Sequence, residues 1–239
     1  MTLYPIADVH YGAQECMEKE FRAYIKAIEQ DNHAAVILAG DLINNGIKSS
    51  VTNCYDETCT PKQQKYDMVD FLMPIKDKII CGARGNHEYR VTKESSFDIM
   101  EDIFRELGIV QCYAKDMGFL KISLGEKPNK KQATYMFAVA HGNGGGQLLG
   151  SGLNKPDAMQ ITIEGIDGII SGHTHKPAKV PSGRLIFDSH NNNIIRGKTM
   201  IFVCTSWLDY GDYPERMLLR PTAFNPDTIR LDGKTKQWS

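Results

Sequence analysis

Arg84-Gly85-Asn86-His87-Glu88 is the stretch of sequence from which the fold can be read. It follows the short apolar run Ile79–Cys81, which is typical of a buried strand. Side chains at the carboxyl ends of strands face the crevice in which open α/β sheets bind ligands. An amide, an imidazole and a carboxylate in succession at such a place favour a ligand site. A polar turn that caps a helix would have the same composition, so this segment alone leaves both interpretations open.

Four other segments repeat this pattern, each directly after an apolar, strand-like run. They are Asp8-Val9-His10, Gly40-Asp41, His141-Gly142 and Gly172-His173-Thr174-His175. A polar turn explains one such segment, but strand ends that repeatedly carry carboxylate, imidazole and amide groups predict a shared site. The candidate ligands are Asp8, His10, Asp41, Asn86, His141, His173 and His175.

These candidate ligands supply oxygen and nitrogen but no thiolate. Such a donor set suits borderline divalent metals, among them manganese, iron(II), zinc and cobalt. The ligands are too many for one ion and suit two ions that share Asp41. Two ions about 3.5–4 Å apart can clamp the attacking and leaving oxygens of a displacement at phosphorus, and metal binding lowers the pKa of water towards about 7. We therefore expect a bridging hydroxide to be the nucleophile.

The remaining pattern predicts an α/β chain without a linker or repeat. Predicted strands lie at Leu3–Ala7, Ala34–Ala39, Lys78–Ala83, Val110–Tyr113, Phe119–Leu124, Thr134–Ala140, Gly168–Ser171, Leu185–Phe187, Thr199–Cys204 and Thr228–Leu231. Apolar residues at helical spacing predict helices at Gln14–Gln30, Lys62–Met73, Ser96–Leu107 and Ala158–Glu164. The segment Asn44–Pro61 has no clear period and is interpreted as an insertion loop beside the site, and Lys127–Lys131 as a solvated hairpin turn. We expect one domain over residues 1–239, with a β-rich ending from about residue 176.

Composition and charge narrow the class of protein. Of the 239 residues, 41% are hydrophobic and 24% are charged, which is typical of a globular protein. The net charge of −1 shows no overall electrostatic footprint for nucleic acid, although a local basic groove is compatible with it. No apolar run is long enough to span a membrane, and no signal peptide is recognised, so we expect a cytoplasmic protein. Cys54 and Cys59 are too few for a zinc site.

As an ordered series, the five motifs resemble those of the calcineurin-like metallophosphoesterases. The resemblance spans residues 8–175 and implies two mixed β-sheets packed as a sandwich flanked by helices, in four layers. It implies a phosphoester hydrolase in which Asp8, His10, Asp41 and His175 hold one divalent ion. Asp41, Asn86, His141 and His173 would hold the second. His87 matches the family's catalytic histidine, which is not a ligand and contacts the scissile phosphate.

Two departures from the family pattern concern the substrate. Protein phosphatases of this superfamily have an arginine after the second motif, whereas here Leu42-Ile43-Asn44-Asn45-Gly46 follows Asp41. His173-x-His175 resembles the phosphodiesterase and nuclease branches. We therefore predict a phosphodiesterase or nuclease that acts on nucleic acid or a nucleotide, with manganese first among the metals and iron, zinc, cobalt or nickel as alternatives. A phosphomonoesterase for a small metabolite or phosphoprotein is the second interpretation. A metal-bearing interaction module with vestigial activity is the third, and the intact His87 argues against it.

Other residues are candidates for contact with the substrate. Arg84 and Arg90 flank the central motif, where each can either neutralise phosphate or form a salt bridge. The glycine-rich segment after His141 lacks the Lys-Ser/Thr ending of a P-loop, but it brings Asn143 and Gln147 towards the predicted site. Tyr55, Tyr89 and Trp207 are candidates for stacking on a base, with core packing as the alternative.

Overall fold

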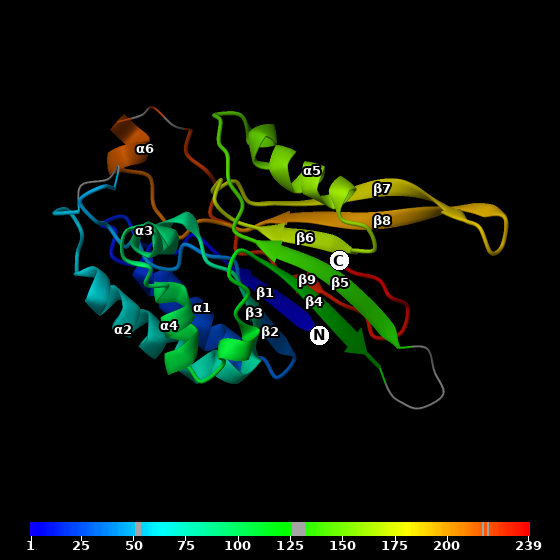
Figure 1. Ribbon diagram of the computed structural model, residues 1–239, viewed down its shortest axis with the longest axis horizontal. Helices are drawn as coiled ribbons and strands as arrows, with labels where there is room; N and C mark the ends of the chain where they lie inside the picture. Colours follow the sequence, from blue (N-terminus) through cyan, green and yellow to red (C-terminus); the bar gives the residue numbers. More distant parts are fainter. Residues whose placement is uncertain (51–53, 126–131, 217, 219) are drawn as a thin grey trace.

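The computed structural model describes residues 1–50, 54–125, 132–216, 218 and 220–239. Two mixed β-sheets lie face to face, and helices cover their outer faces (Figure 1). The predicted α/β sandwich flanked by helices is therefore confirmed.

The first sheet has the strand order β3-β2-β1-β9. Its strands are β1 (Thr2–Ile6), β2 (Ala34–Leu38), β3 (Ile79–Gly82) and the short β9 (Ile229–Arg230). β2 runs parallel to both β1 and β3, whereas β9 is antiparallel to β1. The helices α1 (Glu18–Gln30), α2 (Pro61–Leu72) and α4 (Ile99–Glu106) bury their apolar faces against this sheet in one core cluster.

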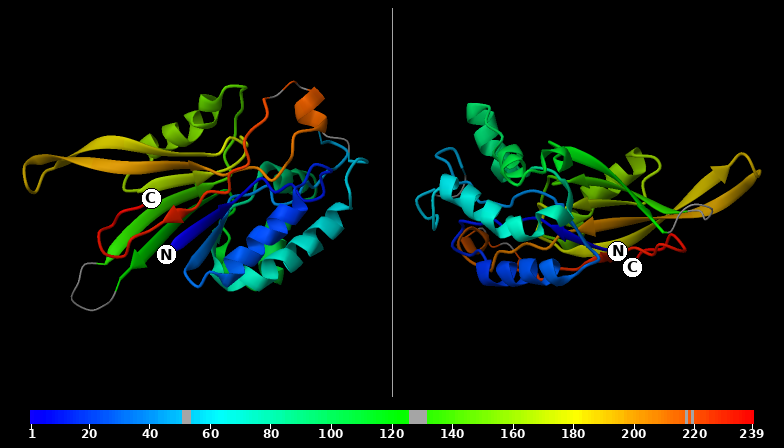
Figure 2. Two further views of the ribbon diagram at one scale, coloured as in Figure 1. Left: turned by 180° about the vertical axis from the view of Figure 1, so that it is seen from behind. Right: turned by 90° about the horizontal axis from the view of Figure 1, so that it is seen from below.

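The second sheet has the strand order β4-β5-β6-β8-β7. Its strands are β4 (Met117–Leu124), β5 (Ala133–Ala140), β6 (Gly168–Ser171), β7 (Ala178–Asp188) and β8 (Asn193–Val203). β6 is parallel to its neighbours β5 and β8, and β4 and β7 are antiparallel edge strands. The helix α5 (Asn154–Thr162) covers the outer face, and the hairpin of β7 and β8 extends beyond the rest of the sheet (Figures 1 and 2).

The core between the sheets holds the strand ends in register. Leu3 and Ile37 of the first sheet pack in one cluster with Tyr135, Phe137 and Phe202 of the second. Burial of each such side chain contributes about 1.5–3 kcal/mol. This packing places the carboxyl ends of β1, β2 and β3 beside those of β5 and β6, which are the strands that precede the five polar motifs.

Some predicted elements are shifted or wrong. The segment Val110–Tyr113 is not a strand: Val110–Cys112 is a 3-10 helix (η2) in which Cys112 N–H donates to the Ile109 carbonyl at 2.9 Å. The helix predicted at Ser96–Leu107 begins later, at Ile99, because Ser96 takes the left-handed conformation (φ 60°) and the Asp98 side chain caps α4. A further helix, α3 (Asn86–Ser95), precedes it and was not predicted.

Other differences concern element ends. α1 begins at Glu18 and not at Gln14, because the N–H groups of Cys16 and Met17 donate to the carbonyls of Ala13 and Trp207. α5 begins at Asn154, earlier than predicted. The short helices η1 (Met73–Lys78), η3 (Leu149–Gly152) and α6 (Asp212–Arg216) complete the described elements. The turn predicted at Lys127–Lys131 lies outside the described residues. None of the helices in the described part of the chain has the length and apolar character required to cross a bilayer.

Candidate metal centre

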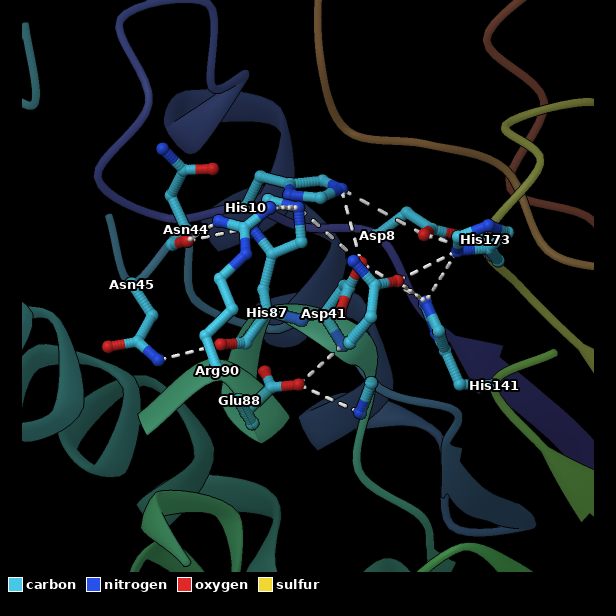
Figure 3. A network of polar contacts seen from close by, with 12 residues as sticks. Asp8, His10, Asp41, Asn44, Asn45, His87, Glu88, Arg90, His141 and His173 are labelled. Carbon is cyan, nitrogen blue, oxygen red and sulfur yellow. Dashed lines mark hydrogen bonds and ion pairs between the residues drawn. The ribbon is translucent and has the colours of Figure 1, made fainter. Parts of the chain in front are cut away.

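The predicted ligands all meet at one edge of the sandwich. Each follows a strand: Asp8 and His10 after β1, Asp41 after β2, Asn86 after β3, His141 after β5, and His173 and His175 after β6. Their side chains converge on the carboxylates of Asp8 and Asp41 (Figure 3). Asp8, His10 and His175 form one group of converging ligand atoms, and Asp41, His141 and His173 form another.

In the first group, the Nε2 atoms of His10 and His175 lie 3.2 Å apart. Asp8 Oδ1 lies 3.4 Å from His175 Nε2 and 3.9 Å from His10 Nε2. Asp8 and His10 are almost fully buried. The first group therefore places one carboxylate and two imidazoles around one point.

In the second group, His141 Nε2 lies 3.1 Å from Asp41 Oδ2 and 3.0 Å from Asn86 Oδ1. His173 Nδ1 lies 2.8 Å from the same Asn86 oxygen. Asp41 Oδ2 is also 3.9 Å from His10 Nε2 in the first group. The carboxylate of Asp41 thus lies between the two groups, as a shared ligand must.

Hydrogen bonds outside the groups orient these ligands. His141 Nδ1 lies 2.7 Å from the Ala39 carbonyl oxygen, to which it donates, so Nε2 is the nitrogen directed at the centre, where a metal would displace its proton. Asp41 Oδ1 accepts from the His87 N–H at 2.8 Å, which leaves Oδ2 for the centre. The Asp8 carboxylate accepts from the His173 N–H at 2.9 Å. The contacts of His141 and Asp41 fix which atom faces the cluster, whereas the His173 N–H holds both oxygens of Asp8.

The backbone at the ligands is unusual. Left-handed φ angles occur at Asp8 (53°), His10 (49°), Asp41 (52°), His173 (71°) and His175 (55°). Residues other than glycine rarely adopt this region, and each instance costs on the order of 1–3 kcal/mol. Main-chain hydrogen bonds between the loops maintain it: Asp8 N–H donates to the Gly40 carbonyl and His10 N–H to the Asp41 carbonyl, both at 3.0 Å. The surrounding structure therefore imposes the conformation that aims the ligands.

Two glycines allow the loops after β2 and β3 to touch. A Cβ atom at Gly85 would lie 2.0 Å from Asp41 Oδ1, and one at Gly40 would lie 2.4 Å from the Gly85 nitrogen. Any side chain at either position would separate Asp41 from Asn86. The glycines of the second and third motifs are thus required by this close approach.

Glu88 also holds the loops after β2 and β3 together. It stands in the central motif, but sequence reasoning did not place it among the candidate site residues. Its fully buried carboxylate accepts hydrogen bonds from four N–H groups, those of Asp41 (3.0 Å), Leu42 (2.7 Å), Ile43 (3.3 Å) and Gly85 (2.8 Å). Burial and then Asp41 raise the pKa of Glu88 to about 7, against the opposing effects of His141 and the backbone donors. Because all four partners are donors, the carboxylate is the form that suits the site. The available signal was a glutamate three residues after a helix N-cap.

Electrostatics prepares the centre for cations. Burial alone would raise the pKa of Asp41, but His141 and His87 outweigh it and hold that pKa well below its usual range. Burial lowers the pKa of His141, but the nearby carboxylate of Asp41 outweighs burial and raises that pKa to about 10. The pKa of His10 is lowered well below its usual value, first by burial and then by His87. A cation that binds here therefore competes with a proton shared near Asp41 and His141.

These observations test whether the residues suit a pair of divalent ions. Imidazole nitrogens converge with one another and with carboxylate and amide oxygens at 2.8–3.9 Å. The donors are imidazole, carboxylate and one amide oxygen, which suits borderline divalent metals. His10 Nδ1 is buried without a hydrogen-bond partner, whereas its Nε2 faces the cluster. The donor set fits the predicted metals.

His87 lies at the edge of the cluster. Its Nε2 is 3.8 Å from Asp41 Oδ2, close enough to form a third possible group with Asp41 and His10. However, Arg90 Nη2 lies 2.9 Å from that same Nε2, and a guanidinium that donates to the lone pair excludes a metal from it. His87 Nδ1 contacts the Asn44 carbonyl oxygen at 2.7 Å. The pKa of His87 is lowered to about 4, first by burial.

The two candidate arginines have different environments. Arg90 lines the cavity beside His87. Arg84 is buried away from it, where Nη1 pairs with Asp98 at 2.9 Å and Nη2 with Asp116 at 2.8 Å. Asn143 is exposed, and the glycine-rich loop lines the cavity with Gly144, Gly145, Gly146 and Gln147 instead. Of these candidates, Arg90 and Gln147 lie where a substrate can be reached.

The cavity over the cluster has a volume of about 870 Å³, much more than a phosphate group requires. The predicted insertion loop contributes Asn44, Asp56 and Glu57 to its wall. The segment from Ser206 to Phe224 contributes a further wall that sequence reasoning missed. Among the aromatic candidates, Trp207 is buried in the core, while Tyr55 and Tyr89 are exposed and do not line the cavity.

A comparison with known protein families agrees with this geometry. The model of the calcineurin-like phosphoesterase family matches residues 1–177. The chain belongs to this family. The phosphoesterase is thus a metal-dependent hydrolase of a dinuclear family, and the predicted resemblance is confirmed. A search among curated proteins finds no match. The cavity wall beyond residue 177 lies outside the matched region.

Proposed function

We propose that the chain is a phosphodiesterase that acts on a nucleic acid or nucleotide ester, with manganese as the first metal to test. One ion is held by Asp8, His10, Asp41 and His175, and the other by Asp41, Asn86, His141 and His173. The observation that carries the proposal is the position of Asp41 Oδ2, which lies 3.1 Å from His141 Nε2 and 3.9 Å from His10 Nε2.

When bound, such a metal pair polarises the phosphoester and supplies a nucleophile near neutral pH. The residues of the chain hold and orient the reacting groups. Because His87 Nδ1 contacts the Asn44 carbonyl, Nε2 is the nitrogen directed at the substrate. We assign this atom to the phosphate: it takes up a proton from solvent when the anionic substrate binds beside it, and then gives that proton to the leaving oxygen. Arg90, which contacts Nε2 in this structure, turns to a phosphate oxygen when the substrate enters.

The preference for a diester follows from the residues after Asp41. Leu42 and Ile43 are fully buried in the core, and Asn44 and Asn45 are uncharged, so this loop brings no cation to the phosphate. A monoester dianion needs extra positive charge, usually from a bidentate arginine. A diester carries a single negative charge, and its poorer leaving group depends more on an acid such as His87.

A second candidate is a phosphomonoesterase, and Arg90 favours it. Its guanidinium lies 2.9 Å from His87 Nε2 on the cavity wall, where it can replace the arginine absent from the second motif. Kinetics of bis(p-nitrophenyl) phosphate and p-nitrophenyl phosphate, with Mn, Ni, Co, Mg and Zn in turn, separates the two. We expect the diester to have the higher kcat/KM with Mn. A monoester that wins by about tenfold or more would establish the second candidate instead.

A further inference from the structure

The cavity continues from the metal centre to an apolar wall. This wall consists of Met17, Leu208, Tyr210, Pro214, Pro221 and Phe224. All but Met17 lie beyond residue 177, outside the part of the chain that matches the family. The metal-binding end of the cavity thus lies within the region that matches the family, whereas most of the apolar end lies outside it.

Hydrogen bonds hold the apolar wall at a fixed distance from the metal centre. The backbone N–H of Trp207 donates to the Asp8 carbonyl at 2.9 Å, and Ser206 Oγ donates to the same oxygen at 3.3 Å. Met17 N–H donates to the Trp207 carbonyl at 2.7 Å. These bonds join the start of the segment that carries most of the wall to the backbone of Asp8, a predicted ligand.

Phe224 is the exposed end of a series of packed aromatic rings. Its ring meets Trp207 edge-on, with centroids 5.0 Å apart. Trp207 is buried and packs in turn against Phe21 at 5.2 Å and Tyr24 at 5.1 Å. Phe224 itself is 40% exposed, yet it lines the cavity. A large apolar ring braced from behind and open to a cavity is arranged to stack on a flat ligand.

Charges around the cavity argue against a long polyanion. Besides the cluster, its lining contains the carboxylates Glu15, Asp56, Glu57 and Asp209 together with the cations Arg90, Lys176 and Arg220. Lys176 Nζ is engaged by Ser151 Oγ at 2.9 Å. The lining residues in the described part of the chain therefore lack the positive excess along which nucleic acid strands bind. A small ester suits this wall better than a polymer.

We propose that the apolar wall is a binding subsite for a flat aromatic group of about nucleobase size, carried by the phosphoester, with Phe224 as its stacking partner. This rests on the proposed phosphoesterase function and names its substrate class as small esters whose non-leaving group bears an aromatic ring of nucleobase size. The wall binds the aromatic group while the phosphate lies at the metal centre. The volume of about 870 Å³ accommodates both parts of such a molecule.

Two substrates with the same leaving group test the subsite: thymidine 5′-(p-nitrophenyl) phosphate and methyl p-nitrophenyl phosphate. We expect the Mn-loaded wild type to favour the thymidine ester in kcat/KM. Phe224→Ala should lower kcat/KM for this ester about tenfold, mainly through KM, since stacking on an aromatic side chain is worth about that factor. The same variant should change the methyl ester by less than about twofold. Phe224→Tyr should restore the preference, and Phe187→Ala, an exposed phenylalanine on β7, should not change it.

Equal losses for both esters, or no thymidine preference in the wild type, would overturn the subsite. If neither ester is hydrolysed, the proposed function fails, and binding decides the subsite separately. Titration of the full chain with thymidine 5′-monophosphate, followed by tryptophan fluorescence, should then show about tenfold weaker binding in Phe224→Ala than in the wild type. Equal affinities in the two proteins, or no binding to either, would refute the proposal in that case.

Discussion

The backbone N–H of Asp41 donates a 3.0 Å hydrogen bond to the buried carboxylate of Glu88. Asp41 follows β2 and Glu88 lies in the first turn of α3, so this bond joins the loops that carry the shared ligand and Asn86. The neighbouring N–H groups of Leu42 and Gly85 bond to the same carboxylate. Glu88 is therefore a positioning residue for Asp41, although it touches neither the cavity nor the other ligands.

Glu88→Gln should destabilise the protein by about 2–3 kcal/mol, because an amide nitrogen replaces an acceptor that faces buried N–H donors. Urea unfolding of the metal-free protein measures this loss. Metal affinity should also fall, since Asp41 loses its support, and isothermal titration with Mn measures it. Glu101→Gln removes an exposed helix pair with Arg105 and serves as the control, with a change below about 0.5 kcal/mol. Similar unfolding curves for Glu88→Gln and wild type would contradict this role.

Asp41→Asn should weaken both metal sites together and reduce activity to near background. The substituted amide keeps its place between the groups but loses the negative charge that a bridging ligand supplies. Elemental analysis of the purified variant should find well under two equivalents of metal, with the circular dichroism spectrum of the fold retained. Two full equivalents in this variant would refute the bridging assignment.

His87→Ala should separate chemistry from metal binding. The variant retains every proposed ligand, so its metal content should equal that of the wild type. Its kcat should fall by roughly 10²–10⁴, the usual contribution of a positioned acid–base group. Loss of metal from this variant would instead make His87 a ligand, as its 3.8 Å distance from Asp41 Oδ2 permits geometrically.

The two arginines form a matched pair of variants. Arg90→Ala should lower kcat/KM while leaving the melting temperature nearly unchanged, because Arg90 lies at the cavity beside His87. Arg84→Ala should do the opposite. It leaves the mostly buried Asp98 without its 2.9 Å partner and should cost about 2 kcal/mol of unfolding free energy. The reverse pattern, with activity lost only in Arg84→Ala, would mean that the substrate lies near Arg84 and not near Arg90.

Cys54 and Cys59 should be dispensable. Both are free thiols in the insertion loop, and neither belongs to a group of converging metal ligands in the described residues. Both thiols are half-buried but lie outside the core clusters of the described residues, so replacement of both by serine should shift the melting temperature by less than about 2 °C. Turnover should also be unchanged. A large drop in melting temperature, or loss of a further metal, would show that the two thiols hold this loop together.

The sequence by itself determined the class of fold and named the candidate ligands that the structure brings together. Apolar runs of strand length alternated with helical periods, and polar motifs after five of these runs marked the edge at which strand ends meet. This worked because the side chains of Asp8, Asp41 and His141 follow buried strands directly, so local order along the chain was enough to predict their proximity.

Tertiary structure alone decided how those residues are aimed and what surrounds them. Left-handed backbone angles at Asp8 and Asp41 oppose local preference and persist only because distant loops hydrogen bond to them. The same dependence on distant contacts separates Arg90 from Arg84, which flank one motif but differ in their partners: His87 for the first, and Asp98 and Asp116 for the second. Phe224 reaches the cavity only because the chain returns to Asp8 near its end. Such contacts join residues about two hundred positions apart, and no local pattern encodes them.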